Sequence, residues 1–332
     1  MSALKGIPQA LARFGVPSEP ILASVNLRAS DLDDPERTAP FATLDRLLGL
    51  CLRRTRCDHF GLLVGQYITL QSFGVAGRIA RHAPSVGAAL QDLAAFFVLH
   101  DSGGSVRVAI HDARVTLGYG IHVPGMKHSD QVYDLAVAAL ANVMRQLCGT
   151  AWRPDAVLLP RKRPADIRPY REHFAAPLRF NSIMTAVVFP ERQLSQTIAD
   201  ADPLVHKLLS DNAVSAIVRR DPGIHGDVRR TIRLLLTQQC SRREVARRLG
   251  LHERTLGRRL QASGTTFQQL LDDTRRDVAQ QLLQDTRVPV AQVAAALAYG
   301  DPTVFTRAFT RWTGRTPSRF RAEPASTPPV VD

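Results

Sequence analysis

The stretch PVAQVAAALAYGDPTVFTRAFTRWTG (289–314) predicts a helix-turn-helix near the C-terminus of the chain. Its first helix has one apolar face, formed by Val290, Val293, Ala294 and Leu297. Tyr299-Gly300 is expected to turn the chain, and Asp301-Pro302 is an N-cap followed by proline at the first helical position. The second helix then buries a stripe of aromatic side chains: Phe305, Phe309 and Trp312.

A second helix-turn-helix is predicted upstream, in SRREVARRLGLHERTLGRRLQASG (241–264). Ser241 with Glu244 forms a capping box, so a helix begins there. Gly250 can adopt the left-handed conformation that ends this helix. The second helix begins near His252 and ends at Gly264, and it buries two leucines, Leu256 and Leu260.

A single long helix over 266–284 is predicted between the two units. Its apolar stripe follows helical spacing through Phe267, Leu270, Leu271, Thr274, Val278 and Leu282. A helix of this length spans roughly 28 Å, and one turn of DNA is ~34 Å. Two recognition helices could therefore enter successive major grooves on one face of double-stranded DNA.

The charge of the chain supports a polyanionic partner. The 332 residues carry 43 Lys+Arg against 30 Asp+Glu, a formal net charge of +13. Residues 225–323 hold 18 Arg, no Lys and 9 acidic residues, which leaves +9 on this segment. Arginine binds phosphates and guanine edges through two parallel hydrogen bonds, whereas lysine acts as a point charge.

Three arginines of the first predicted recognition helix are candidate DNA contacts. Arg254 and Arg258 are four residues apart and face away from the buried leucines, so they are predicted to reach base edges, with guanine as the expected base. Arg259 is expected to meet phosphates or solvent, as are Arg247 and Arg248 of the preceding helix. Arg311, near the end of the second unit, fits a contact to the DNA backbone.

The N-terminal part of the chain is predicted to mix helices and strands. Period-two alternation predicts a β-hairpin over 106–119. Helices are expected through the first ~100 residues and over 130–148 and 192–218, and short strands over 156–159 and 185–189. Asp202-Pro203 interrupts the last helical stretch. The expected fold class is an α+β N-terminal sensor domain followed by an all-α domain with two helix-turn-helix units joined by a long helix.

Four segments are expected along the chain. Residues 1–200 form the first domain, 201–224 a linker that ends in the turn-forming Asp221-Pro222-Gly223, 225–323 the DNA-binding domain, and 324–332 a disordered, Pro-rich tail.

These residues resemble the AraC/XylS-type transcription regulators. The signature-like residues of the second unit are Val293-Ala294, Leu297, Tyr299, Phe305 to Phe309, Trp312, Gly314, Thr316-Pro317-Ser318 and Phe320-Arg321. The first unit is similar through Val245-Ala246, Leu249-Gly250, Arg254-Thr255-Leu256 and Arg258-Arg259-Leu260. His59-Phe60-Gly61-Leu62 to Gly65, and PYREHFAAPLRFNS (169–182), resemble the arabinose-binding-type sensor domain of a subset of these regulators.

The resemblance implies sequence-specific binding of promoter DNA, with Thr303, Thr306 and Arg307 at groove-facing positions. It implies effector sensing and dimerisation by residues 1–200, so a small-molecule effector of unknown identity and a homodimer are expected, with RNA polymerase as a candidate partner. Three residues depart from the pattern. Ala298 replaces the usual Gly, so that turn is expected to be tighter or less left-handed. His252 stands where Ser or Thr commonly caps the recognition helix. Gly257 puts no side chain at a position that often faces the bases.

Two other functions stay open beside the effector-responsive regulator. One is an architectural DNA binder without an effector, and the other is an enzyme-like N-terminal domain fused to a DNA-binding domain. The sequence lacks the P-loop, H-E-x-x-H and G-x-S-x-G motifs, so no enzyme activity and no catalytic residue are predicted. The four scattered cysteines indicate neither a metal site nor a disulfide scaffold, and no cofactor is expected.

The chain is expected to be cytoplasmic, because no secretory signal is read and its four scattered cysteines suit a reducing compartment. No membrane span is expected, because no stretch of ~18 apolar residues occurs. The hairpin and Phe96-Phe97 either line a pocket or belong to the core, and no pocket residue is assigned from the sequence.

Overall fold

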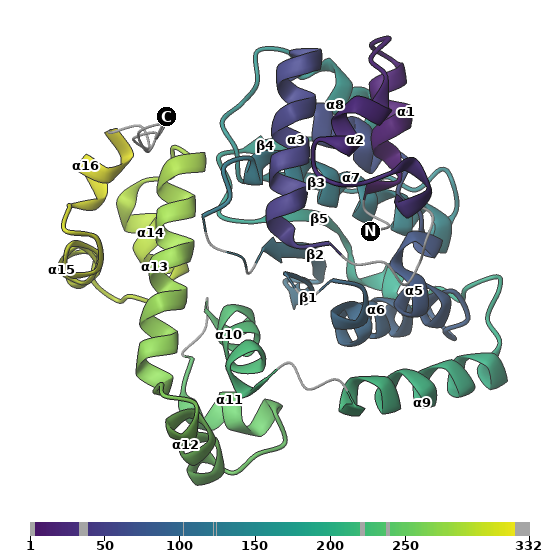
Figure 1. Ribbon diagram of the computed structural model, residues 1–332. Helices are drawn as coiled ribbons and strands as arrows, with labels where there is room; N and C mark the ends of the chain where they lie inside the picture. The colour runs from purple at the N-terminus through teal and green to yellow at the C-terminus, as the bar shows by residue number, and fades with distance from the viewer. Residues whose placement is uncertain are drawn as a thin grey trace. The chain divides into compact units, whose positions relative to one another are not determined.

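The computed structural model describes residues 4–32, 39–101, 103–121, 123, 125–219, 223–236 and 240–322. The chain forms two compact units that divide between residues 221 and 222 (Figure 1). The predicted tail, 324–332, and the turn residues Asp221-Pro222 lie outside the described residues.

The N-terminal unit contains a five-stranded sheet in the order β1-β2-β5-β3-β4. Its strands are β1 (Gly104–His111), β2 (Arg114–Ile121), β3 (Ala156–Leu159), β4 (Leu178–Phe180) and β5 (Thr185–Pro190). Only the β3–β4 pair is parallel. The predicted hairpin is present, with Val106 opposite Tyr119 and a two-residue turn at Asp112-Ala113, both at positive φ.

Helices make up the rest of this unit (Figure 1). They are α1 (Gly6–Ala12), α2 (Ser18–Ala23), α3 (Phe41–Thr55), α4 (Phe60–Gly65), α5 (Gly74–Arg81), α6 (Val86–His100), α7 (Ser129–Cys148), α8 (Arg168–Phe174) and α9 (Pro203–Arg219). Short 3-10 turns are η2 (Ala29–Leu32), η3 (Leu70–Phe73) and η4 (Glu191–Ser195).

Helix α7 is the centre of the N-terminal core, and it contacts both the sheet and α4. It is buried along most of its length, which explains why apolar residues occur on all its sides. A Cβ on Gly61 would lie 2.0 Å from the carbonyl oxygen of Gln131, and one on Gly65 would lie 2.4 Å from that of Leu135. The two glycines of the His59–Gly65 motif therefore allow α4 to approach the backbone of α7 closely.

The predicted helical stretch 192–218 is only partly helical. Residues 191–195 form η4, and α9 begins only at Pro203, where the Asp202 carboxylate accepts the N–H groups of Leu204 and Val205 at 3.0 Å each. Ile198 is buried outside any helix, whereas Leu204 and Leu208 are 68% and 57% exposed. The predicted interruption at Asp202-Pro203 is therefore present, whereas the part before it forms only the short 3-10 turn η4 in place of a helix.

The C-terminal unit is built around α13 (Phe267–Asp285), as Figure 1 shows. Helices α10 (Gly223–Leu235), α11 (Arg242–Arg248) and α12 (Glu253–Ala262) pack together, with α10 against α13. Helices α14 (Val290–Ala296), α15 (Pro302–Thr313) and α16 (Pro317–Ala322) also contact α13. The predicted stripe of α13 has Leu270, Leu271, Thr274 and Leu282 buried, and the remaining two positions are partly buried.

The two helix-turn-helix units have the same turn. Gly250 has φ +64° after α11, and Ala298 has φ +57° after α14. The next residue donates its N–H back into the helix in both cases, from Leu251 to Ala246 O at 2.9 Å and from Tyr299 to Ala294 O at 3.0 Å. The expectation that Ala298 would make the turn less left-handed is therefore wrong, and the turn lies at Ala298 rather than at Gly300.

Candidate DNA interface and ligand cavity

Helix α12 presents arginines on the face opposite its buried side. Leu256 and Leu260 are 0% and 1% exposed, and Arg254 and Arg258 lie about half a helical turn from them, with Arg259 on the flank. All three arginines are exposed. His252 begins the helix, and its Nδ1 accepts the N–H of Arg254 at 3.4 Å, so a histidine takes the capping role of the expected Ser or Thr.

The preceding helix α11 begins as predicted at Ser241, whose hydroxyl accepts the N–H of Glu244 at 3.2 Å. The Glu244 carboxylate instead pairs with Arg247 and Arg248, at 2.7 and 3.1 Å. Two arginines of α11 therefore share one carboxylate of their own helix.

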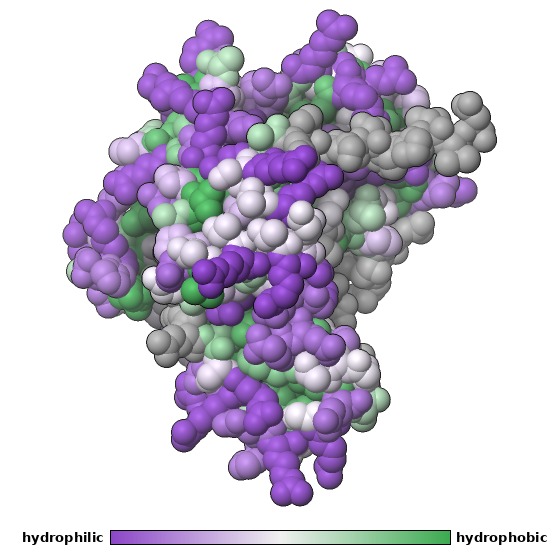
Figure 2. Space-filling model, turned by 90° about the vertical axis from the view of Figure 1, so that its left-hand side faces the viewer, coloured by the Kyte–Doolittle hydropathy of each residue, from purple (hydrophilic) through white to green (hydrophobic). Residues whose placement is uncertain are grey.

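Each described carboxylate of the C-terminal unit is engaged within that unit. The ion pairs are Arg230–Asp227, Arg242–Glu253, Arg247 and Arg248 with Glu244, Arg311–Asp272, Arg229 and Arg276 with Asp273, and Arg233 and Arg276 with Asp277. Asp301 caps α15. Over residues 223–236 and 240–322, no carboxylate pairs with Arg254, Arg258 or Arg259. Figure 2 shows long hydrophilic side chains projecting from the end of this unit that α12 forms.

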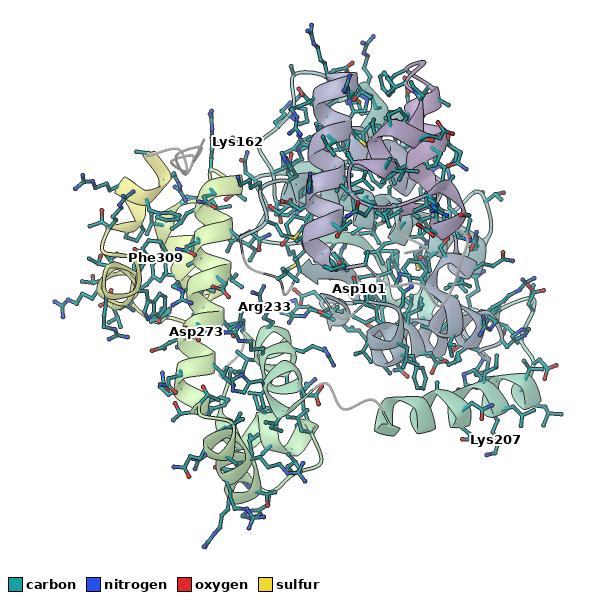
Figure 3. The ribbon with its side chains drawn as sticks, viewed as in Figure 1. Asp101, Lys162, Lys207, Arg233, Asp273 and Phe309 are labelled. Carbon is teal, nitrogen blue, oxygen red and sulfur yellow. The ribbon has the colours of Figure 1, made fainter. Side chains whose placement is uncertain are left out.

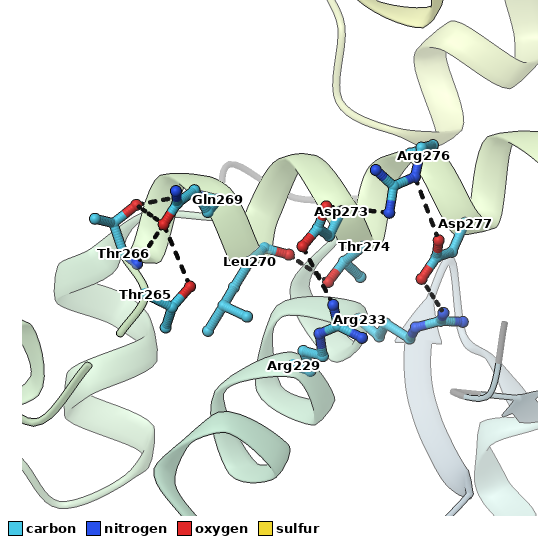
Figure 4. A network of polar contacts seen from close by, with 10 residues as sticks. All are labelled: Arg229, Arg233, Thr265, Thr266, Gln269, Leu270, Asp273, Thr274, Arg276 and Asp277. Atoms are coloured by element: carbon cyan, nitrogen blue, oxygen red, sulfur yellow. Dashed lines mark hydrogen bonds and ion pairs between the residues drawn. The ribbon is translucent and has the colours of Figure 1, made fainter. Parts of the chain in front are cut away.

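The pairs between α10 and α13 form a network (Arg233 and Asp273 are labelled in Figure 3, and Figure 4 shows the contacts). Arg229 lies 3.2 Å from Asp273, and Arg233 lies 3.7 Å from Asp277, with both side chains of the second pair 8% exposed. Arg276 joins the two aspartates, at 3.1 Å from Asp273. Arg233 is buried, whereas Arg229 and Arg276 are partly exposed, and the pairs that Arg229 and Arg233 form with α13 join the two helices.

Helix α15 offers a different surface. Phe305 and Phe309 are fully buried, while Thr303 and Arg307 are exposed on the opposite face. The half-buried Thr306 donates its hydroxyl to Pro302 O at 2.9 Å, so this oxygen can accept a hydrogen bond but its proton is already used. Arg311 lies 3.5 Å from Asp272 of α13.

Two exposed residues were not singled out from the sequence. Val304 on α15 is 52% exposed, and Arg243 on α11 is exposed with no ion pair to any described carboxylate. Val304 could have been noticed in the sequence, because it is an apolar residue outside the aromatic stripe of α15. Composition alone could not separate Arg243 from the paired arginines around it.

The N-terminal unit contains a cavity of about 480 Å³ between α3, η3, α6, the hairpin and α7. The hairpin residues Val106 and Tyr119 line it, as does Phe97, whereas Phe96 does not. Its other walls are mainly apolar, including Phe41, Leu44, Phe73 and the α7 residues Val132, Leu135, Ala139 and Leu140.

Asp101, labelled in Figure 3, brings a carboxylate to this cavity at the end of α6. Its Oδ1 accepts the N–H groups of Gly103 at 2.8 Å and Gly104 at 3.1 Å, and its Oδ2 accepts the Tyr119 hydroxyl at 3.0 Å. A Cβ on Gly104 would lie 2.2 Å from the Tyr119 hydroxyl oxygen. The glycine therefore allows the turn to close beneath the tyrosine.

Burial controls the charge of the neighbouring groups. It raises the pKa of Asp101, against the lowering effect of the hydrogen bonds from Gly103, Tyr119 and Gly104. It lowers the pKa of His100 to about 4, so this imidazole is neutral at pH 7. The His100 ring lies 5.2 Å from that of Phe73 and 5.6 Å from that of Phe97, between centroids.

The cysteines have the character of packed, unreactive side chains. All four are free thiols, with Cys51 and Cys57 buried. Burial raises the pKa of Cys51 to about 12 and of Cys148 to about 11, far from the range of a nucleophilic thiolate. Within the described residues, no group of three or more His, Cys, Asp or Glu could hold a metal ion. No described helix is long and apolar enough to cross a membrane.

Comparison with known proteins matches both units to families. Residues 15–198 match the family described as the arabinose-binding domain of AraC transcription regulators, N-terminal, and residues 245–323 match a helix-turn-helix domain family. The HTH-type transcriptional regulator VirS of Mycobacterium tuberculosis is 28% identical over 280 residues, 83% of this chain and 82% of that protein. The ornithine utilization regulator of Pseudomonas aeruginosa is 26% identical over 317 residues, 95% and 93% of the two chains.

Among solved structures, the transcriptional regulator CdpR from Pseudomonas aeruginosa matches with 25% identity and a TM-score of 0.48. The match covers 97% of this chain and 98% of that one.

Proposed function

Because the chain belongs to the AraC-type transcription regulators, we propose that α12 and α15 read promoter DNA and that a small molecule bound by the N-terminal unit controls this binding. One observation carries the assignment of α12: its outward arginines are left without carboxylate partners among described residues, while the acids of the same unit pair with other arginines or cap a helix. Unpaired guanidinium groups on one helix face produce the positive potential that attracts phosphates.

The residues have separate roles on the DNA. Arg254 and Arg258 reach base edges in the major groove, and Arg259 contacts phosphates from the flank of α12. On α15, Arg307 and Thr303 face the groove, Thr306 accepts a hydrogen bond from a base, and Arg311 contacts the backbone. Val304 adds an apolar contact to a thymine methyl group.

The N-terminal unit acts as the sensor, and the cavity is its ligand site. The effector acts by shifting a population, so it must bind two arrangements of the protein with different affinity. The segment 201–224 transmits the change, and residues 1–200 form a homodimer. The protein works in the cytoplasm, has no enzyme activity, and regulates transcription at promoters where RNA polymerase binds. An effector-independent architectural binder is the alternative, and ligand-dependent DNA affinity separates the two.

The test is selection of DNA sequences from a random pool by the full chain and by single variants. The wild-type protein is expected to enrich one motif. Arg258→Ala should cost about 1–3 kcal/mol on that motif and relax preference at one base pair. Arg259→Ala should weaken all sequences alike and reduce the salt dependence of binding, and Val304→Ser should lose preference at a thymine.

Arg247→Ala is the matched control, because Arg247 is an exposed arginine that is already paired with Glu244. It should keep the wild-type motif. An unchanged sequence profile for Arg258→Ala would overturn the assignment of α12, and failure of the wild-type chain to enrich any motif would overturn the proposed function.

A further inference from the structure

We propose that the cavity of the N-terminal unit binds a mainly apolar small molecule that carries an amine, with its ammonium group at Asp101. This inference rests on the proposed function, since the ligand would be the effector of the sensor. It adds the chemical class, which follows from the walls of the cavity and from the one carboxylate among its described lining residues.

The walls favour a ligand with a substantial apolar body. The cavity of about 480 Å³ lies in the range that encloses drug-sized molecules. Apart from His100, Asp101 and Tyr119, the side chains that line it are apolar. Phe41, Phe73, Phe97 and Tyr119 are aromatic, and such rings attract a cation over their faces.

The charge of the cavity has one sign. Asp101 is the only acidic side chain among the described lining residues, and no Lys or Arg is among them. Three donors already reach its carboxylate, two at Oδ1 and one at Oδ2, which leaves Oδ2 able to accept one further hydrogen bond. Among the described lining residues this carboxylate has no counter-charge. A buried carboxylate without a counter-charge is costly, and a ligand cation would remove that cost.

His100 adds a neutral hydrogen-bonding group beside the carboxylate. Its ring packs against Phe73 and Phe97, and in the described part of the chain no hydrogen bond to its imidazole nitrogens is found. A neutral imidazole offers one acceptor nitrogen and one donor N–H. An ammonium group can therefore donate both to Asp101 and to the histidine.

The same arrangement excludes the opposite ligand charge. A carboxylate ligand would bring a second negative charge next to Asp101, in a cavity without a cationic side chain among the described lining residues. A neutral alcohol would avoid this repulsion but would leave the Asp101 charge uncompensated. The expected order of affinity is amine, then alcohol, then carboxylate.

The test uses three probes with one apolar body: 4-phenylbutylamine, 4-phenyl-1-butanol and 4-phenylbutyrate. Binding to the full chain is measured by calorimetry at pH 7, without DNA. The amine is expected to bind roughly tenfold or more tightly than the alcohol, the size of a hydrogen bond to a charged group. The carboxylate should bind most weakly.

Variants connect this preference to the cavity. Asp101→Asn keeps an oxygen for the two glycine N–H groups and should abolish the preference for the amine over the alcohol. Asp112→Asn removes the same charge from the exposed hairpin turn, where the side chain is 85% exposed, and should leave the preference unchanged. Leu140→Trp fills the cavity and should abolish binding of all three probes.

Equal or tighter binding of the alcohol or the carboxylate, or no binding of the amine, would overturn the inference. DNA affinity with and without the amine is measured separately. If the amine binds at Asp101 but DNA affinity does not change, the ligand class stands and the sensor role in the proposed function fails. If the full chain binds no DNA, the proposed function fails, and the order of affinity for the amine, the alcohol and the carboxylate still tests the inference.

Discussion

Ala298 and Gly250 show how one backbone conformation governs each helix-turn-helix. Both residues take positive φ, +57° and +64°, two positions after the last residue of the first helix. Left-handed backbone costs an ordinary L-residue roughly 1–2 kcal/mol, because its Cβ approaches the carbonyl oxygen. Glycine avoids this cost, so the alanine turn carries strain that the glycine turn does not.

Ala298→Gly is expected to stabilise the C-terminal unit by up to about 1 kcal/mol. Relief of the Cβ contact is partly offset by the greater freedom of glycine in the unfolded chain. Gly250→Ala should destabilise the same unit by a similar amount. Urea unfolding, followed by the fluorescence of Trp312 in a Trp152→Phe background, measures the free energy of unfolding of both variants. The prediction requires that the two substitutions change this free energy in opposite directions.

Two histidines are expected to make the stability of the N-terminal unit depend on pH. Burial lowers the pKa of His100 and of His173 to about 4, below the ordinary value of 6.5. The unfolded chain then binds protons at a pH where the folded chain does not, so stability present above pH 6.5 is lost as the pH falls toward 4. The loss is at most ~3 kcal/mol for each histidine.

The measurement is urea unfolding between pH 7 and pH 4, followed at Trp152 after Trp312→Phe removes the other tryptophan. A double variant with His100→Gln and His173→Gln should flatten the decline. If the double variant declined as steeply as the parent, the histidines would not be its source.

At the level of elements, α10 and α13 are joined by charges as well as by leucines. Arg233 and Asp277 form a buried pair, and burial raises the pKa of the Asp277 carboxyl while Arg233 lowers it. A buried pair contributes little net stability by itself, but removal of one partner leaves the other without its counter-charge.

Asp277→Ala is therefore expected to destabilise the C-terminal unit by about 3 kcal/mol. Asp272→Ala, which removes a more exposed pair with Arg311 at 3.5 Å, should cost less than ~1 kcal/mol. Chemical unfolding compares the two. Equal costs would mean that burial of the Arg233–Asp277 pair does not matter.

At the level of the whole molecule, the positive charge is concentrated in the segment proposed to bind DNA. Residues 225–323 carry +9 of the total +13. The N-terminal unit has its own core around α7 and its own cavity. DNA affinity and ligand response are thus expected to belong to different parts of the chain.

A chain limited to residues 222–332 is expected to keep DNA binding at low salt and to lose any response to the small molecule. Its core, from Val228 to Phe309, is separate from that of the N-terminal unit. Fluorescence anisotropy with the selected motif measures both properties. A folded segment, checked by circular dichroism, that bound no DNA would contradict this division.

Secondary structure was most predictable where a single periodicity ran without interruption. The hairpin, α7, α12, α13 and α15 follow clear spacing, and each agrees with the structure. One error arose before Asp202, where the apolar spacing of Leu194 and Ile198 indicated a helix but only the short 3-10 turn η4 forms. Another arose at Ala298, where an alanine takes a turn conformation that glycine usually takes. The short strand β4 was missed, because its three residues are too few for any periodicity.

The sequence by itself determined the two helix-turn-helix units, the family and the concentration of arginine, because spacing, caps and composition are local properties of the chain. Only the tertiary structure decided which arginines of α10 and α13 are paired, since Asp273 and Asp277 of α13 meet Arg229 and Arg233 of α10 through space. It also decided that Asp101, His100 and Tyr119 meet at one cavity. Their contacts depend on how the end of α6, the glycine turn and the hairpin pack together, which no periodicity records.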